Sequence, residues 1–255
     1  MDEAERFARD GYVVFDGTFE PAFIDELKAE YVRQFPDIAS SPDRFSVGNR
    51  RLQVPVRMTG PYLSPHFYAN SALLALASAA LGEDYLIDSL AVVTALPGAK
   101  PQHLHVDHDD LFPGKPFTRA AMGAYGITVA IPLVDLTPDT GTTKLFRASH
   151  VKSRDDEDFE LPYIERGRCY AMDYRLAHQG TDNRATTERP MVYLVYARPW
   201  FTDTTNYGAE NRIRIAPDDL AAVPKEHRAL FRRLSPERSG RIARSALRPE
   251  AQERQ

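Results

Sequence analysis

The sequence predicts an α+β domain that is mainly β, in which a few early helices brace an antiparallel barrel or sandwich. Two observations support this prediction. Helical patterns are concentrated in the first third of the chain, and short apolar runs with the period of a strand follow them, separated by loops rich in Asp, Thr, Gly and Pro. With 255 residues and 43% apolar composition, the chain can bury one sizeable core.

The first helix is expected over residues 2–10. Asp2 and Glu5 have the spacing of a capping box, in which each side chain accepts a hydrogen bond from the backbone of the other residue. Gly11 is suited to the left-handed position that ends a helix. The apolar run at residues 12–15 then predicts a strand directly after the helix.

Two longer helices are expected next. Pro21 suits the first turn of a helix that turns one face toward a sheet, with side chains at four-residue spacing: Phe23, Leu27 and Tyr31. Asn70 is a favourable N-cap for the apolar segment 71–81, and Gly82 stands where a left-handed terminating residue is expected.

Strand patterns occupy much of the chain up to residue 198. The clearest is the alternation over residues 125–133, which predicts a core strand. Residues 37–51 are polar and irregular, and residues 52–56 predict a short edge strand because they include Pro55. The other expected strands cover residues 85–94, 143–146, 169–174 and 191–198.

The strand pattern fades after Trp200. One short amphipathic helix is expected near the end, from its apolar residues Leu230, Phe231 and Leu234. The sequence contains no repeat and no second set of domain signals. We therefore expect one domain over residues 1–235, followed by a charged, mobile C-terminal tail over residues 236–255.

The composition favours a soluble protein that acts on small molecules. The 36 acidic and 32 basic residues give a net charge of −4, so no overall basic surface for nucleic acid is expected. The single cysteine, Cys169, excludes an internal disulfide framework and indicates a reducing compartment. No secretory signal pattern and no run long enough for a membrane span are found. We expect a cytoplasmic monomer or homodimer without a membrane partner.

Residues 101–110 concentrate side chains that can bind a metal. Three of the seven histidines lie in this stretch. If the stretch is a strand, alternate residues share one face, which would then carry His103, His105, Asp107 and Asp109. An imidazole and a carboxylate would converge there.

His105 and Asp107 therefore provide two ligands of a 2-His-1-carboxylate facial triad, which holds Fe(II) and leaves other coordination positions open. The best candidate for the third ligand is His178, which lies between a strand-like run and a polar, turn-rich loop. His108-x-Asp110 is a second such triplet, and either triplet could belong to a solvated acidic loop. We favour His105 with Asp107 because the other pair would share the face of the apolar residues in the stretch.

Arginines provide candidates for binding an anion. Arg189 begins the strand expected after His178 and would lie on the same face as the apolar side chains of that strand. A guanidinium can hold a carboxylate through two hydrogen bonds. The alternative is a strand-edge charge paired with a nearby carboxylate. Arg50, Arg51 and Arg57 cluster around the expected edge strand, as either a solvated surface or a contact for an anionic substrate.

These residues resemble the phytanoyl-CoA dioxygenase-like family of Fe(II)/2-oxoglutarate-dependent oxygenases, and the resemblance covers most of the chain. Arg147-Ala148 replaces the Pro-Gly that is usual in the family, and Gly180 stands where many relatives have a hydroxyl residue. The matching segments are Phe7–Val14, Gln102-x-x-His105-x-Asp107, Gly141–His150, His178-x-Gly-x-x-Asn183, Arg189-Pro190 and Arg198–Trp200.

The resemblance implies a double-stranded β-helix, also called a jelly roll or cupin-like fold, with iron held by His105, Asp107 and His178. It implies that Arg189 binds the C5 carboxylate of 2-oxoglutarate. Gln102 and Thr143 resemble residues that line the cosubstrate or substrate pocket. Because of Gly180, the second contact to the cosubstrate is open, with Thr181 or Tyr193 as candidates.

The family chemistry uses Fe(II), 2-oxoglutarate and O₂, and releases succinate and CO₂. Relatives that halogenate have a small residue in place of Asp107, so the resemblance implies a hydroxylase acting on a C–H bond, with desaturation and cyclisation as variants. The chain lacks an evident CoA-binding segment, which favours a small metabolite, for example of secondary metabolism. Two alternatives are a non-redox cupin-type metal enzyme, a hydrolase or isomerase, and a catalytically silent binding barrel.

Overall fold

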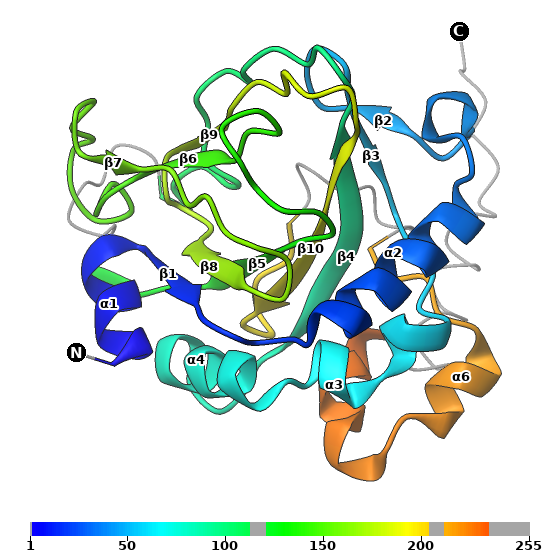
Figure 1. Ribbon diagram of the computed structural model, residues 1–255. Helices are drawn as coiled ribbons and strands as arrows, with labels where there is room; N and C mark the ends of the chain where they lie inside the picture. Colours follow the sequence, from blue (N-terminus) through cyan, green and yellow to red (C-terminus); the bar gives the residue numbers. More distant parts are fainter. Residues whose placement is uncertain (1, 113–120, 204–211, 235–255) are drawn as a thin grey trace, which may run out of the picture.

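The computed structural model describes residues 2–112, 121–203 and 212–234 (Figure 1). Two antiparallel sheets face each other, and helices cover the outer face of the larger sheet. The smaller sheet lies over β1, β8 and β5, whereas β3 and β2 lie at the opposite edge of the larger sheet. This arrangement agrees with the mainly β, α+β architecture predicted from the sequence.

The larger sheet has the strand order β1-β8-β5-β10-β4-β3-β2. Its strands are Tyr12–Phe15 (β1), Phe45–Ser46 (β2), Arg51–Val54 (β3), Leu86–Ala95 (β4), Gly126–Pro132 (β5), Cys169–Asp173 (β8) and Arg189–Ala197 (β10). The smaller sheet, in the order β7-β6-β9, consists of Thr143–Phe146 (β6), Phe159–Glu160 (β7) and His178–Gly180 (β9).

The helices lie mostly near the two ends of the chain. The α-helices are Glu3–Asp10 (α1), Pro21–Gln34 (α2), Pro65–Tyr68 (α3), Ser71–Leu81 (α4) and Pro217–Ala222 (α6). The 3-10 helices, which have fewer residues per turn, are Ile38–Ser40 (η1), Gly60–Leu63 (η2) and Lys225–Leu234 (η3). The last of these covers the amphipathic segment predicted near the end of the chain.

The helix ends follow the capping residues of the sequence. The Asp2 carboxylate accepts a hydrogen bond from the backbone N–H of Glu5 at 2.8 Å, and Gly11 ends α1 in the left-handed conformation with φ of 83°. Asn70 caps α4, as predicted. Gly82 differs from the prediction, since it has φ of 81° but an extended ψ of 176° instead of the left-handed value.

Several strands lie where the sequence pattern predicts them, including β1 and β6 with the predicted bounds. The predicted edge strand is β3, but the true edge is β2, whose two residues are too few to show a period-two pattern. The strand assumed over residues 101–110 in the alternation argument does not form. That segment is a loop with a single bridge between His105 and His178.

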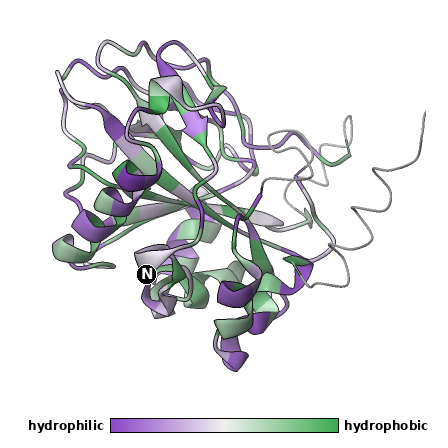
Figure 2. Cartoon of the chain, turned by 90° about the vertical axis from the view of Figure 1, so that its right-hand side faces the viewer, coloured by the Kyte–Doolittle hydropathy of each residue, from purple (hydrophilic) through white to green (hydrophobic). Residues whose placement is uncertain are grey.

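The core lies on both faces of the larger sheet. Alternate residues such as Leu90, Val92 and Leu194 pack with the helices, while Tyr12, Tyr170 and Met172 pack on the inner face against side chains of the smaller sheet and its loops. Figure 2 shows hydrophobic strands through the middle of the molecule and helices that carry both hydrophobic and hydrophilic residues. The inner face is therefore where a site between the sheets can form.

Within the described residues, no helix is both long enough and apolar enough to cross a membrane. The predicted tail over 236–255 lies outside the described residues, so the boundary of the domain at residue 235 stays a prediction.

The cap of α4 allows a test of the fold. Asn70 Oδ1 accepts from Ala72 N at 3.1 Å, while its Nδ2 donates to the carbonyl of Thr18 at 3.1 Å. Asn70→Ala should lower the free energy of unfolding by about 1–2 kcal/mol, measured by urea denaturation. Asn70→Asp keeps the acceptor and should lower the free energy of unfolding by less. Equal losses in the two variants would mean that the Thr18 contact, and not the cap, stabilises this helix.

Candidate metal centre

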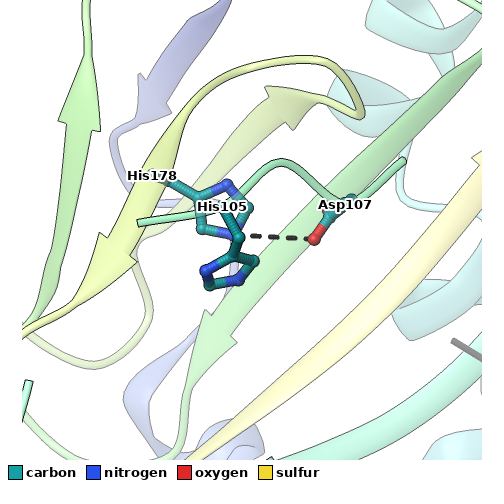
Figure 3. A group of neighbouring side chains, drawn as sticks. All are labelled: His105, Asp107 and His178. Atoms are coloured by element: carbon teal, nitrogen blue, oxygen red, sulfur yellow. Dashed lines mark ion pairs between the residues drawn. The ribbon is translucent and has the colours of Figure 1, made fainter. Parts of the chain in front are cut away.

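Three metal-binding side chains converge on the inner side of the smaller sheet (Figure 3). His105, Asp107 and His178 each offer one ligand atom, and these atoms lie within 4.8 Å of one another. The His178 Nε2 lies 3.5 Å from the Asp107 Oδ1. Among the described residues, this is the group of His, Cys, Asp or Glu side chains with the spacing of a metal site.

The backbone brings the two histidines together. His105 N donates to the carbonyl of His178 at 3.0 Å, and His178 N donates to the carbonyl of His105 at 2.8 Å. The loop around His105 thus pairs with the free edge of β9, and the two imidazole centroids lie 4.3 Å apart. The predicted alternation along a strand is not what brings His105 and Asp107 together, because the intervening chain is a loop.

Neighbouring groups orient all three ligand side chains. The Nδ1 atoms of His105 and His178 each lie 2.9 Å from a backbone carbonyl, that of His103 and Leu176 respectively. A ring that donates from Nδ1 leaves the lone pair of Nε2 available to a metal. Thr128 of β5 donates to Asp107 Oδ2 at 2.5 Å, which leaves Oδ1 facing His178.

The protonation state of His105 suits a metal ligand. Burial, and then the neighbouring His178, lower the pKa of its imidazole below the ordinary value. The ring is therefore neutral near pH 7, which is the form that coordinates a metal. The donor set of two imidazoles and one carboxylate fits Fe(II) in the facial-triad arrangement.

In the second triplet, His108-x-Asp110, the histidine makes different contacts. The ring of His108 packs edge-on against Phe201 at 5.1 Å and Tyr125 at 6.0 Å, and its Nδ1 lies 2.7 Å from the carbonyl of Asp109. This aromatic contact lies apart from the cluster formed by His105 and His178. The geometry agrees with the choice of His105 and Asp107 over His108 and its neighbour.

Arg189 is buried at the start of β10, with 2% of its surface exposed. Its Nη1 donates to the carbonyl of Thr140 at 2.8 Å, and its Nη2 reaches the carbonyl of Thr181 at 3.3 Å. Burial lowers the pKa of this guanidinium. Within the described chain it forms no ion pair with a carboxylate, which differs from the alternative of a paired strand-edge charge.

Arg51 of β3 is a second buried arginine beside Arg189, and the sequence pattern does not distinguish it from Arg50 and Arg57. It is 2% exposed, and its Nη2 donates to the same carbonyl of Thr181 and, at 3.3 Å, to that of Lys100. Its Nε is buried without a hydrogen-bond partner. Burial, and then repulsion from Arg189, lower the pKa of Arg51 to about 10.

The pairing register of the strands explains why Arg51 lies beside Arg189. Arg51 and Arg189 both lie opposite Ala95 of β4, one on each side of that strand. Residues in one row of a sheet point to the same face, so the two guanidinium groups necessarily meet on the inner face. The sequence does not reveal this row, because it does not specify which strands pair.

Gly180 explains how Arg51 reaches this position. A Cβ at Gly180 would overlap Gln102 Oε1 and would approach Arg51 Nη1 at 3.2 Å. The space of the missing side chain is thus filled by these two residues. Thr181, a candidate for the second cosubstrate contact, instead exchanges hydrogen bonds with the backbone of Thr142 through its hydroxyl.

Gln102 and Thr143 lie on either side of Gly180. The Gln102 amide donates to the carbonyl of Val47 at 2.9 Å and accepts from Gly180 N at 3.2 Å, so it fastens the loop before the metal ligands. Thr143 is buried on β6, and Tyr170 donates to its hydroxyl at 2.7 Å. Their contact with a cosubstrate stays a prediction.

Solved structures of other proteins share this fold. AviO1 from Streptomyces viridochromogenes Tue57 is 22% identical, with a TM-score of 0.60 over 79% of this chain and 96% of that chain. The epimerase SnoN, in complex with Fe3+, alpha ketoglutarate and nogalamycin RO, is 18% identical, with a TM-score of 0.62 over 85% of this chain and 95% of that chain. HygX from Streptomyces hygroscopicus, with nickel and 2-oxoglutarate bound, is 14% identical, with a TM-score of 0.63 over 78% and 87%.

At these identities the likeness establishes the fold, and the expected double-stranded β-helix is confirmed. The family follows from the sequence itself, because a profile of the phytanoyl-CoA dioxygenase (PhyH) family matches residues 7–191, most of the chain. This protein therefore belongs to the phytanoyl-CoA dioxygenase family of iron- and 2-oxoglutarate-dependent enzymes.

Proposed function

We propose that this enzyme hydroxylates an unactivated C–H bond of a small metabolite, with His105, Asp107 and His178 as the iron ligands. The observation that carries the proposal is the convergence of their ligand atoms within 4.8 Å, with Nε2 of both histidines and Oδ1 of the carboxylate left available. When bound, the iron supplies the oxidation of the C–H bond, with 2-oxoglutarate and O₂ consumed and succinate and CO₂ released.

The protein's own residues orient this chemistry. The carbonyls of His103 and Leu176 fix the imidazole rings, and Thr128 fixes one oxygen of Asp107, so the ligands need little rearrangement to bind. A carboxylate at position 107 fills the third ligand position, which favours hydroxylation over halogenation. Family membership favours an oxygenase over the non-redox metal enzyme and the silent barrel.

We also propose that Arg189 and Arg51 together bind the distal carboxylate of 2-oxoglutarate. Two buried guanidinium groups share one carbonyl and form no ion pair within the described chain, although the charge of Asp182 acts on both of them. Burying a charge is costly unless an anion accompanies it. A dicarboxylate that chelates the metal with one end and reaches the arginines with the other provides that anion.

Epimerisation is the second candidate reaction, because one structural neighbour is the epimerase SnoN. Both reactions begin with removal of a substrate hydrogen and need the same metal and cosubstrate. An oxygen-18 experiment separates them, since only hydroxylation transfers an atom of ¹⁸O₂ to the product.

An anaerobic titration of the Fe(II)-loaded protein with 2-oxoglutarate tests the proposal directly. A weak visible charge-transfer band should appear as the cosubstrate chelates the iron. If iron is bound and no band develops, the proposed function is wrong and the non-redox metal enzyme becomes the better assignment.

Ligand variants should separate metal binding from folding. His105→Ala and Asp107→Ala should each weaken Fe(II) binding by more than about 100-fold, because loss of a direct ligand exceeds the effect of losing an orienting partner. Far-UV circular dichroism should remain that of the wild type. His108→Ala is the matched control and should keep its iron. Loss of iron in this control would favour the second triplet.

Arginine variants should change cosubstrate affinity alone. Arg189→Lys and Arg51→Gln should each raise the Kd for 2-oxoglutarate by about 10-fold or more, because each loses hydrogen bonds to a charged group. The charge-transfer titration measures this Kd. Arg50→Gln is the control, since Arg50 is exposed and donates to the carbonyl of Pro97. An unchanged Kd in Arg51→Gln would leave Arg189 as the single clamp.

A further inference from the structure

The inner face of the larger sheet is covered unevenly. On the side of β1 and β8, Tyr12, Tyr170 and Met172 form a buried cluster with Leu145 of β6. The smaller sheet ends at β9, whose free edge exchanges two backbone hydrogen bonds with His105 and accepts one from Gln102 N. The strands β4, β3 and β2 continue beyond this edge, on the right of the molecule in Figure 1.

Accessible side chains lie on this part of the inner face, where Val93, Gln53 and Phe45 form a row and Tyr193, opposite Ala91, stands diagonal to Val93. Tyr193 is the one residue of β10 that is not buried, and Val93 is the one such residue of β4. Gln53 of β3 is partly exposed, and Phe45 of β2 is 53% exposed. Val93 lies opposite Gln53, and Gln53 lies opposite Phe45, so these side chains share one face.

Tyr193 connects this row diagonally to the metal centre. Thr128, which holds Asp107, lies opposite Val195 of β10, and Tyr193 is the next residue on the same face of that strand. From β10 to β2 there are three strand spacings, or about 14 Å. That span matches a small organic molecule with one end near the metal.

The other end of the sheet does not offer such a surface. Beyond Val195, the inner face is closed by Tyr125, Tyr174 and Phe201, which are all buried and pack on one another. The side of β1 and β8 is closed by the smaller sheet. Within the described residues, the row on β4, β3 and β2 is therefore the open part of the inner face.

The side chains of the row define the chemistry of a ligand. Val93, Gln53 and Phe45 carry no charge, and Arg51, which faces the same way, donates to the carbonyls of Thr181 and Lys100. Because Arg51 is assigned to the carboxylate of the cosubstrate, Val93, Gln53 and Phe45 themselves offer no counter-charge to a charged group of a ligand. The exposed phenyl ring suits the flat face of another ring, and the amide of Gln53 can both donate and accept a hydrogen bond.

We propose that Phe45, Gln53 and Val93 form the substrate-binding wall, and that the substrate is an uncharged, ring-containing molecule with a hydroxyl or carbonyl group. Its ring lies against Phe45, its polar group bonds to Gln53, and its reacting C–H lies near Tyr193. The inference rests on the proposed function, because it places the reacting carbon beside the metal.

Paramagnetic line broadening tests the wall without knowledge of the substrate. The protein is loaded with Mn(II) and 2-oxoglutarate, and the line widths of the ring protons of benzyl alcohol are measured by NMR. Phe45→Ala and Gln53→Ala should each reduce the protein-dependent broadening by about two- to tenfold, the size expected for one ring contact or hydrogen bond. Benzoate and benzylammonium should be broadened less than benzyl alcohol.

Ser46→Ala is the matched control, because Ser46 is the exposed neighbour of Phe45 on the opposite face of β2. The line broadening of benzyl alcohol by Ser46→Ala should equal that by the wild type. Equal broadening in all variants, or broadening of benzoate as strong as that of benzyl alcohol, would overturn the wall assignment.

The Fe(II) charge-transfer titration of the same variants keeps the two proposals apart. A normal band in Phe45→Ala together with reduced broadening supports the wall. A normal band with unchanged broadening contradicts the wall alone. A missing band in the wild type contradicts the proposed function.

Discussion

Two backbone hydrogen bonds between His105 and His178 hold the candidate metal centre together. They tie a loop between β4 and β5 to the free edge of β9, and so bring into contact two imidazoles from distant parts of the chain. The local turn of that loop and the hydrogen bond from Thr128 then place Asp107 beside the two histidines, which completes the set of three candidate ligands. The ligand geometry therefore depends on edge pairing between short segments, more than on any long strand.

The two buried arginines impose a second constraint. Arg51 and Arg189 lie in one row of the larger sheet, where burial, and then repulsion from Arg189, lower the pKa of Arg51. Backbone carbonyls satisfy part of their hydrogen-bonding capacity without neutralising the charge. This buried positive charge supports the proposed binding of an anion, and without an anion it costs some stability.

The sequence predicted those features that depend on local patterns. The capping box of Asp2 and the cap at Asn70 act within a few residues, and the metal-binding residue types are concentrated in a short stretch. The row that contains Arg51 and Arg189 was not predicted, because it arises from the pairing of β3, β4 and β10. Residues 101–110, considered as a strand in the alternation argument, form a loop with one bridge, and the sequence does not specify this edge pairing with β9.

Unequal sheet size connects these features. The smaller sheet covers the larger one from β1 toward β10 and ends where His105 pairs with β9, so the metal ligands lie at the boundary between covered and uncovered inner face. On the covered side, packed apolar side chains exclude water. On the uncovered side, accessible side chains remain on β4, β3 and β2. The proposed iron at this boundary would have packed side chains behind it and room for a substrate in front, which is the arrangement that the proposed C–H oxidation requires.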